Sequence, residues 1–429
     1  MKNYKKVYAA FILAGGLILH GCNGIFDDLA INPNQPSMGA YFTSPSAVND
    51  AVMTMYGYMS TQRCLGASGS KTTIIRSDEA SSNSDYGKPG MFGADLNASY
   101  YTIEQPYTLM YTTASQASYI IETAPSVDFS GNEELRNAYM GEAYFWRAFA
   151  HYYLLINFRN ISPIRQMPRN GDDYVRPLEK PAAVWDFIQE DLAHAKELLP
   201  VKGYWDSKNA GRVTKASAAA LLGKAYLYRS GIEQYYGEDK TTFYSEAAKE
   251  FGDVIDGKYG TYDLTKNYAD NFDVAHENNE ESILEFQFLG DVDNAGFNPG
   301  LATSGLAFDS RGLMLPGAGV GYEGVVHNWL YNAFVNSVDK DGYTDIRMFS
   351  TMIFNDLDAS IHLRNDADGN PVRLEGPGGY KWEELYPAKN GKEGFATVSN
   401  PLAHSFKAGI RKGIDCSMPT QTEADGTPK

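Results

Sequence analysis

The sequence has little cysteine, few basic residues relative to acidic ones, and no long apolar run. Lysine and arginine total 37 against 53 acidic residues, so the formal net charge is −16. This balance argues against nucleic acid and anionic lipid headgroups as partners, because both would be repelled. The 3 cysteines are Cys22, Cys64 and Cys416. The last two are isolated, which is typical of free thiols, although an oxidising compartment would let them form a disulfide.

Motifs of catalysis and of metal or cofactor binding are also missing. The 7 histidines show no metal-ligand spacing, and neither Gly-x-Ser-x-Gly nor a phosphate-binding loop occurs. Residues 319–324 fit the glycine pattern of a dinucleotide site, but no strand precedes them. Residues 366–370 begin like a calcium loop, yet Pro371 replaces the required glycine and Pro377 the final glutamate, so a β-turn is predicted. We expect no metal and no cofactor, while the many carboxylates leave a glycosidase open.

The N-terminal apolar run is too short to cross a bilayer. It spans residues 7–19 and follows three lysines, which is the pattern of a secretory signal peptide over residues 1–21. The run ends Leu-His-Gly-Cys, which resembles the lipobox of bacterial lipoproteins and predicts acylation of Cys22. More than one acyl chain gives stable membrane anchoring; simple secretion is the alternative. Because residues 1–21 hold three lysines and no acid, their removal changes the net charge from −16 to −19.

A long helical pattern runs through residues 130–164. Ser130 and Glu133 have the spacing of a capping box, and no glycine or proline follows Gly141 until Pro163. Apolar residues fall on two rows at helical spacing, namely Leu135, Ala138, Phe145, Phe149, Tyr152 and Ile156, and Tyr139, Ala143, Trp146, Ala150 and Tyr153. A helix that is apolar most of the way round is buried on several sides. We therefore expect a central helix with other helices packed around it.

Further helices are expected on either side of this segment. Ser44 and Pro45 open one, with proline in its first turn. Others are predicted over residues 105–123 and 182–199 from their apolar spacing and the prolines at their ends. We therefore expect this region to fold as an all-helical bundle.

One helix pair has the pattern of a tetratricopeptide repeat. Thr214 is a suitable N-cap, and Leu-Gly-x-x-Tyr at residues 222–226 matches the first half of the repeat. Ala247 and Phe251 fit the second half, with an inserted loop expected around residues 231–242. Small residues in the first helix would let its neighbours approach closely.

The character of the chain changes after Gly260. Residues 282–288 alternate as a strand does. Residues 290–324 are rich in glycine without periodicity, and a loop this long is typical of a functional or disordered segment. A short helix is predicted over residues 328–335. Because a chain of this length exceeds one simple core, we expect two lobes.

Several of these segments together resemble one protein family. Glu142-Ala143, Arg147-Ala148, Gly-Arg-x-Thr-Lys at residues 211–215 and Asn-x-Glu-Ser-Ile-Leu-Glu-Phe-Gln-Phe at residues 279–288 are similar to the SusD/RagB family of Bacteroidetes-type bacteria. Two departures are visible. The family has glycine where this chain has Arg159, and its C-terminal helical pair is missing here.

The resemblance implies a mostly α fold. It predicts a signal peptide over residues 1–21, a tetratricopeptide-like helical region over 22–260, and a loop-rich lobe with short β-strands over 261–429, incomplete at the C-terminus. It also implies a lipid-anchored outer-membrane protein, exposed on the cell surface, that binds glycans and delivers them to a SusC-like TonB-dependent transporter without catalysis. A peptide-binding protein or structural helper of the transporter is one alternative, and a surface glycosidase is another.

The family has no fixed binding motif, so the ligand site is predicted from side-chain chemistry. Sugar rings stack on aromatic rings, while their hydroxyls need planar or charged partners, and binding residues favour loops on rigid supports. Two irregular regions qualify, with Asp78, Asn83, Asp85, Tyr86, Phe92, Tyr100 and Tyr101 in the first and Phe297, Phe308, Tyr322 and Trp329 in the second. Both are expected on one surface; a merely solvated loop is the alternative for the first. Trp329 is expected half-buried because apolar residues share its helix, and Trp146 and Trp185 are assigned to helix cores.

Overall fold

The computed structural model describes residues 42–61, 63–66, 80–81, 98–168, 173, 175–272, 274–287, 325–326, 328–353, 361–372 and 409–410. Its α-helices are α4 (Pro45–Ser60), α6 (Tyr101–Thr123), α7 (Glu133–Phe158), α8 (Pro181–Leu198), α9 (Lys215–Tyr236), α10 (Tyr244–Ile255), α12 (Asn328–Asn336) and α13 (Arg347–Thr351). Short 3-10 helices are η1 (Ala124–Ser126), η3 (Ser207–Asn209), η4 (Tyr268–Phe272) and η5 (Val274–His276). The strands have two residues each: β1 (Ala80–Ser81), β2 (Val325–Val326), β3 (Met352–Ile353) and β4 (Gly409–Ile410). The prediction of a mostly α fold is confirmed.

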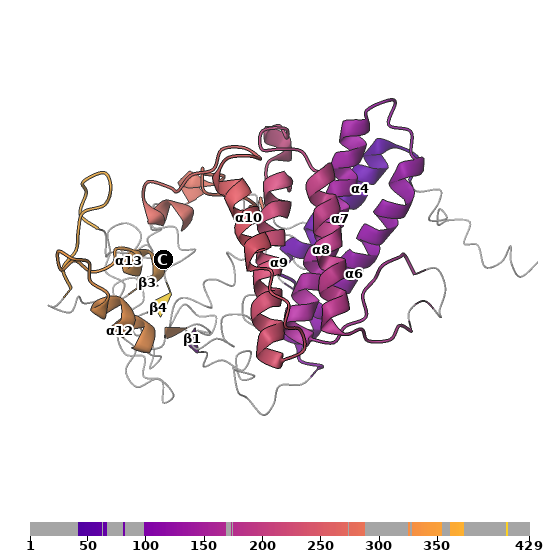
Figure 1. The fold of residues 1–429 in the computed structure, drawn as a ribbon. Helices are drawn as coiled ribbons and strands as arrows, with labels where there is room; N and C mark the ends of the chain where they lie inside the picture. Colours follow the sequence, from indigo (N-terminus) through magenta and orange to yellow (C-terminus); the bar gives the residue numbers. More distant parts are fainter. Residues whose placement is uncertain are drawn as a thin grey trace, which may run out of the picture.

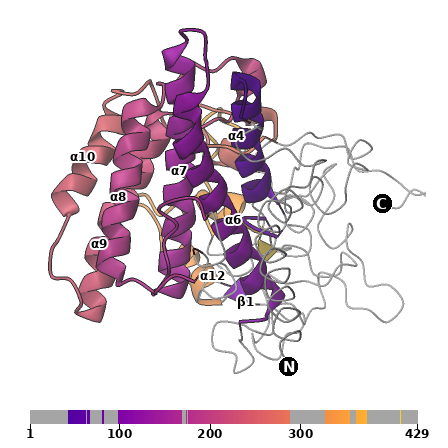
Figure 2. The ribbon, with the colours of Figure 1, turned by 90° about the vertical axis from the view of Figure 1, so that its right-hand side faces the viewer.

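Helices α4 and α6 to α10 form the helical bundle (Figures 1 and 2). Each helix from α6 to α10 packs against the next one in the chain, as tetratricopeptide-like pairs do, and α4 packs on α6 and α7. One continuous core of buried side chains runs through α4 and α6 to α9. A separate small cluster, with Ala216, Ala219, Val254 and Tyr259, joins α10 to α9. Within the described residues, none of the helices combines the length and the apolar character that crossing a membrane requires.

Helix α7 is the central helix, as predicted. It contacts α4, α6, α8 and α9, and both predicted rows of apolar side chains are buried or half-buried except Ile156. The predicted capping box is wrong: the Asn132 side chain, and not Ser130, accepts the backbone N–H of Leu135. Ser130 has φ of +54° in the turn before the helix, which leaves Asn132 at the capping position.

Helices α9 and α10 form the predicted repeat-like pair. Thr214 is the N-cap of α9 and forms a capping box with Ser217. A Cβ atom built on Gly223 would lie 2.8 Å from the Phe251 ring, so only glycine lets α10 approach this closely. The predicted loop over residues 231–242 is present only in its second half. Helix α9 continues to Tyr236 and ends at Gly237 with φ of +69°, and residues 237–243 connect it to α10.

The remaining described elements form a second lobe, which we define as α12, α13 and the four-stranded sheet. In Figure 1 it lies to the left of α10. All strand pairs are antiparallel, in the order β1-β2-β4-β3. Among the described residues, the core of this lobe contains Tyr331, Met348 and Ile361, with partly buried neighbours.

A strand was predicted for residues 282–288. The structure describes residues 282–287, and these form no strand, so the prediction is wrong there. The alternation instead reflects packing on the bundle, because Leu284 and Phe286 lie against the bundle core. The carbonyl of Ile283 accepts a hydrogen bond from the Ser217 hydroxyl at 3.1 Å, so a bundle side chain replaces a strand partner.

Candidate functional site

The sheet joins the two irregular regions that the sequence placed on one surface. β1 lies in the first region, and it pairs with β2, which stands between Tyr322 and Trp329 in the second. The register places Ala80 opposite Val326 and Ser81 opposite Val325. Segments more than 240 residues apart in the sequence are therefore neighbours in the fold.

Helix α12 follows β2 and turns one aromatic side chain outward. Tyr331 is only 5% exposed and belongs to the lobe core, against which Leu330, Phe334 and Val335 pack. Trp329 is 47% exposed. The prediction that this side chain is half-buried is confirmed, and the indole offers apolar surface beside the sheet.

A loop after α12 places charged groups near an aromatic ring. Arg364 donates to the carboxylates of Asp339 at 2.9 Å and Asp341 at 2.6 Å. Its guanidinium carbon lies 4.3 Å from the centroid of the Tyr343 ring. The backbone N–H of Tyr343, together with Arg364, holds the pKa of Asp339 below its ordinary value. All these groups are at the surface, where a ligand can reach them.

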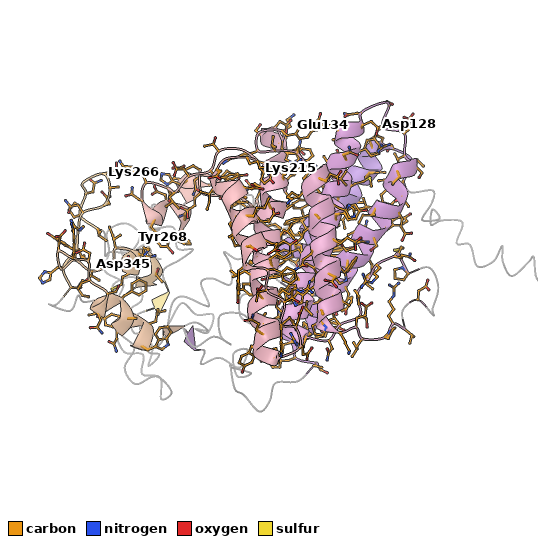
Figure 3. The ribbon with its side chains drawn as sticks, viewed as in Figure 1. Asp128, Glu134, Lys215, Lys266, Tyr268 and Asp345 are labelled. Carbon is orange, nitrogen blue, oxygen red and sulfur yellow. The ribbon has the colours of Figure 1, made fainter. Side chains whose placement is uncertain are left out.

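Residues 366–370 form the predicted β-turn. The Asp366 carboxylate accepts the N–H groups of Asp368 and Asn370 at 2.9 and 2.8 Å. The Asp368 carboxylate pairs with Lys266 and accepts from the Asn267 amide, so this turn binds the segment that leaves the bundle. Figure 3 shows Lys266, Tyr268 and Asp345 in this part of the molecule. Among the described residues, no group of three or more metal-ligating side chains is suited to a metal.

Most of the predicted site residues lie outside the described residues. This holds for the lipidation residue and for most of the predicted contacts, namely Cys22, Asp78, Asn83, Asp85, Tyr86, Phe92, Phe297, Phe308 and Tyr322. Tyr100 is the N-cap residue of α6, and Tyr101 is the first residue of that helix. The helix thus begins four residues before the predicted start, with Pro106 inside it.

Cys64 is a free, fully buried thiol. Burial raises its pKa to about 12, so the reactive thiolate is scarce at neutral pH. Its proposed partner Cys416 lies outside the described residues.

Three of the charged residues in the family-like segments are buried in ion pairs. Arg147 donates to Asp191 with two hydrogen bonds of 2.7 Å. Arg212 binds Glu142 in the same two-pronged way, with an Nε–Oε1 distance of 2.8 Å. These side chains link α7 to α8 and to the start of α9, so their role is structural.

Arg159 takes a backbone conformation that favours glycine. Its φ is +66° at the end of α7, the position where the family has glycine. Two hydrogen bonds of 2.7 Å join its guanidinium to the buried Glu233 carboxylate, which also accepts from Trp185. This pairing offsets the strain of the left-handed backbone.

Comparison with known proteins agrees with this architecture. A sequence model of a SusD-like family, described as starch-binding and associating with the outer membrane, matches residues 30–227. A SusD-like protein of Bacteroides ovatus is 26% identical over 293 residues, which are 67% of this chain. The chain spans about half the length of the curated relatives it matches, 51% of this one and 55% of a SusD-like protein of Formosa agariphila.

Solved structures share the fold. A SusD superfamily protein of Bacteroides vulgatus superposes with a TM-score of 0.63 at 20% identity, covering 87% of this chain and 68% of that one. A laminarin binding SusD-like protein superposes with a TM-score of 0.58 at 18% identity, covering 86% and 77%. The chain therefore resembles a SusD-like family in sequence over residues 30–227, and it shares the fold of SusD superfamily structures.

Proposed function

We propose that this protein binds glycans at the cell surface and delivers them to a SusC-like TonB-dependent transporter. In this proposal a lipid on Cys22 anchors it to the outer membrane, and the protein performs no chemistry on its ligand. The glycan contacts the second lobe beside the sheet, where it stacks on the exposed side chain of Trp329. Tyr86, Tyr101 and Tyr322 are further candidates for contact with the sugar.

One observation carries the proposal of the site. The β1–β2 pairing brings together the two regions in which sugar-binding side chains were predicted, and Trp329, three residues after β2, is 47% exposed. An exposed indole on a helix whose other aromatic residues are packed inward provides a fixed surface for a sugar ring.

The relatives support a glycan as the ligand. The matching family is described as starch-binding, and one structural relative is named for laminarin binding. The acidic balance of the chain favours neutral glycans over polyanionic ones.

Binding is tested with a panel of starch, laminarin and other neutral oligosaccharides by isothermal titration calorimetry. Trp329→Ala should weaken binding of the best panel member by about 1–3 kcal/mol, taking stacking of a base on an aromatic ring as the nearest measured analogue. Tyr235→Ala is the matched control, because Tyr235 is an 84% exposed aromatic residue on the bundle. Equal affinity of both variants and of the unmodified protein would place the site elsewhere.

Two further measurements test the other parts of the proposal. Chromatography of each oligosaccharide after incubation should recover it unchanged, and released product would contradict a binding-only role. Cys22→Ala should move the protein out of the membrane fraction. Retention in that fraction without incorporation of labelled lipid would contradict the anchor.

A further inference from the structure

A groove lies on the bundle between α6, α7 and the segment that connects α7 to α8. It encloses about 1100 Å³ and is lined in part by Tyr144, Arg147, Arg165, Gln166 and Arg176. This volume is slightly above the usual range of about 300–1,000 Å³ for small-molecule pockets. The groove uses none of the residues of the second lobe.

The arginines of the groove are held in fixed orientations. Arg147 is paired with Asp191 as described, and its guanidinium lies 5.0 Å from the ring centroid of Phe187. Arg165 lies 4.4 Å from the same ring. Arg176 donates to the carbonyl oxygens of Asp173 and Gln166 at 2.5 and 3.2 Å. Fixed donors lose little conformational entropy when they bind a ligand.

Arg165 retains donors for a ligand. Its Nη2 donates to Glu179 at 2.7 Å, and within the described part of the chain its Nε and Nη1 have no hydrogen-bond acceptor. The side chain is 41% exposed. A guanidinium has five N–H groups in a planar fork, so Arg165 offers a planar set of donors to the groove.

Among the described residues, the charges around the groove nearly cancel. Three arginines are accompanied there by four carboxylates, which belong to Glu122, Asp173, Glu179 and Asp191. Apolar surface comes from Tyr144, Met167 and Val175. Planar donors and acceptors next to apolar surface suit a neutral ligand with hydroxyl groups and C–H faces.

We propose that this groove is a second carbohydrate site, which takes a neutral oligosaccharide. This inference rests on the proposed glycan-binding function and adds a contact on the bundle to the one on the second lobe. Hydroxyl groups of the sugar accept from Arg165 and donate to the carboxylates, while its C–H faces lie against Tyr144 and Met167. Two separated sites would let one long glycan be held at two points.

The test uses calorimetry of the full chain with maltoheptaose and laminarihexaose as probes, in a Trp329→Ala background that removes the lobe contact. Arg165→Ala should weaken the remaining binding at least fivefold. Val175→Glu should do the same, because Val175 is 85% exposed and a carboxylate there would compete for the donors of Arg165 without disturbing the core. Arg136→Ala is the control, since Arg136 is an arginine on α7 outside the groove, paired with Glu133.

Each outcome has one meaning. Weakening by Arg165→Ala and Val175→Glu but not by Arg136→Ala supports the groove, even if Trp329→Ala alone changes nothing and the lobe site fails. If Trp329→Ala abolishes all binding, or if the groove variants behave like Arg136→Ala, the groove proposal is overturned while glycan binding stands. If an equal concentration of oligogalacturonate displaced the neutral probes from the groove, the assignment of the groove to neutral sugars would be overturned. Absence of binding to every panel member overturns both proposals.

Discussion

The helical bundle and the second lobe are stabilised in different ways. The bundle has a large core that is continuous from α4 through α6 to α9, and it buries its main ion pairs, such as Arg212–Glu142, whose side chains are 4% and 0% exposed. The described core of the lobe has three buried side chains, and its ion pairs, such as Arg364–Asp339, are 49% and 41% exposed. A buried network defines one conformation, whereas exposed pairs on short elements contribute little to stability. The bundle is therefore suited to be the scaffold and the lobe to adapt to a ligand.

The largest expected effect comes from breaking a buried pair in the bundle. Glu142→Ala leaves Arg212 buried without its carboxylate and removes the acceptor of the Tyr56 hydroxyl. We expect a loss of about 3–5 kcal/mol in the free energy of unfolding, the usual cost of an uncompensated buried charge. Urea titration followed by circular dichroism measures it.

Glu134→Ala is the control for this variant, because Glu134 is an exposed acidic residue on the same helix (Figure 3). Its loss should change stability by less than about 0.5 kcal/mol. Equal effects of the two variants would show that the buried network does not stabilise the bundle.

His151 should make the bundle sensitive to acid. Burial lowers its pKa to about 3, and it bridges the carbonyl of Arg147 and the N–H of Ile164 as a neutral ring. The unfolded chain takes up this proton near pH 6.5 and the native state does not, so stability falls as the pH drops from 6.5 towards 3. Between pH 6.5 and 4.5, His151→Gln should lose about 2 kcal/mol less than the unmodified protein. Urea titrations at both pH values measure this difference, and identical losses would contradict the assignment.

A pair of glycines on α9 separates packing from helix propensity. Gly223→Ala would place a methyl group against the Phe251 ring and should cost about 1–3 kcal/mol. Gly231→Ala meets no atom within 4 Å and should stabilise the helix by about 0.5–1 kcal/mol. Thermal melts of both variants give the comparison, and a stabilising Gly223→Ala would show that α10 does not approach as closely as described.

The smallest effect is expected in the lobe. Arg364→Ala removes a guanidinium that binds two exposed carboxylates, and such pairs contribute about 0–1 kcal/mol. Thermal unfolding should hardly change, in contrast to Glu142→Ala. A loss of several kcal/mol in the free energy of unfolding would mean that ion pairs stabilise the lobe as strongly as they stabilise the bundle.

The helices could be predicted because their apolar spacing is local. Trp146 and Trp185 are fully buried, as their helical context indicated. The buried pairs were not predicted, because Glu142 and Arg212 stand 70 residues apart and nothing local links them. Alternation in residues 282–287 indicated correctly that Leu284 and Phe286 pack inward. It did not show that their partner is a helix surface, or that Ile283 packs against a second buried cluster.

The candidate site was predictable only in outline. Aromatic and polar composition indicated two regions, and the half-exposure of Trp329 followed from the spacing of α12. The pairing of Ala80 with Val326 depends on contacts across most of the chain. The groove escaped prediction because its arginines come from α7 and from a connection that has no periodic pattern.

The central claim is that the second lobe contacts the glycan, and hydrogen–deuterium exchange of the full chain tests this claim most directly. The exchange is measured with and without a saturating amount of the tightest-binding oligosaccharide of the panel. Peptides that contain β2 and α12 should exchange more slowly with the oligosaccharide bound, because Trp329 and the adjacent sheet become covered. Unchanged exchange in these peptides at saturation would contradict the account.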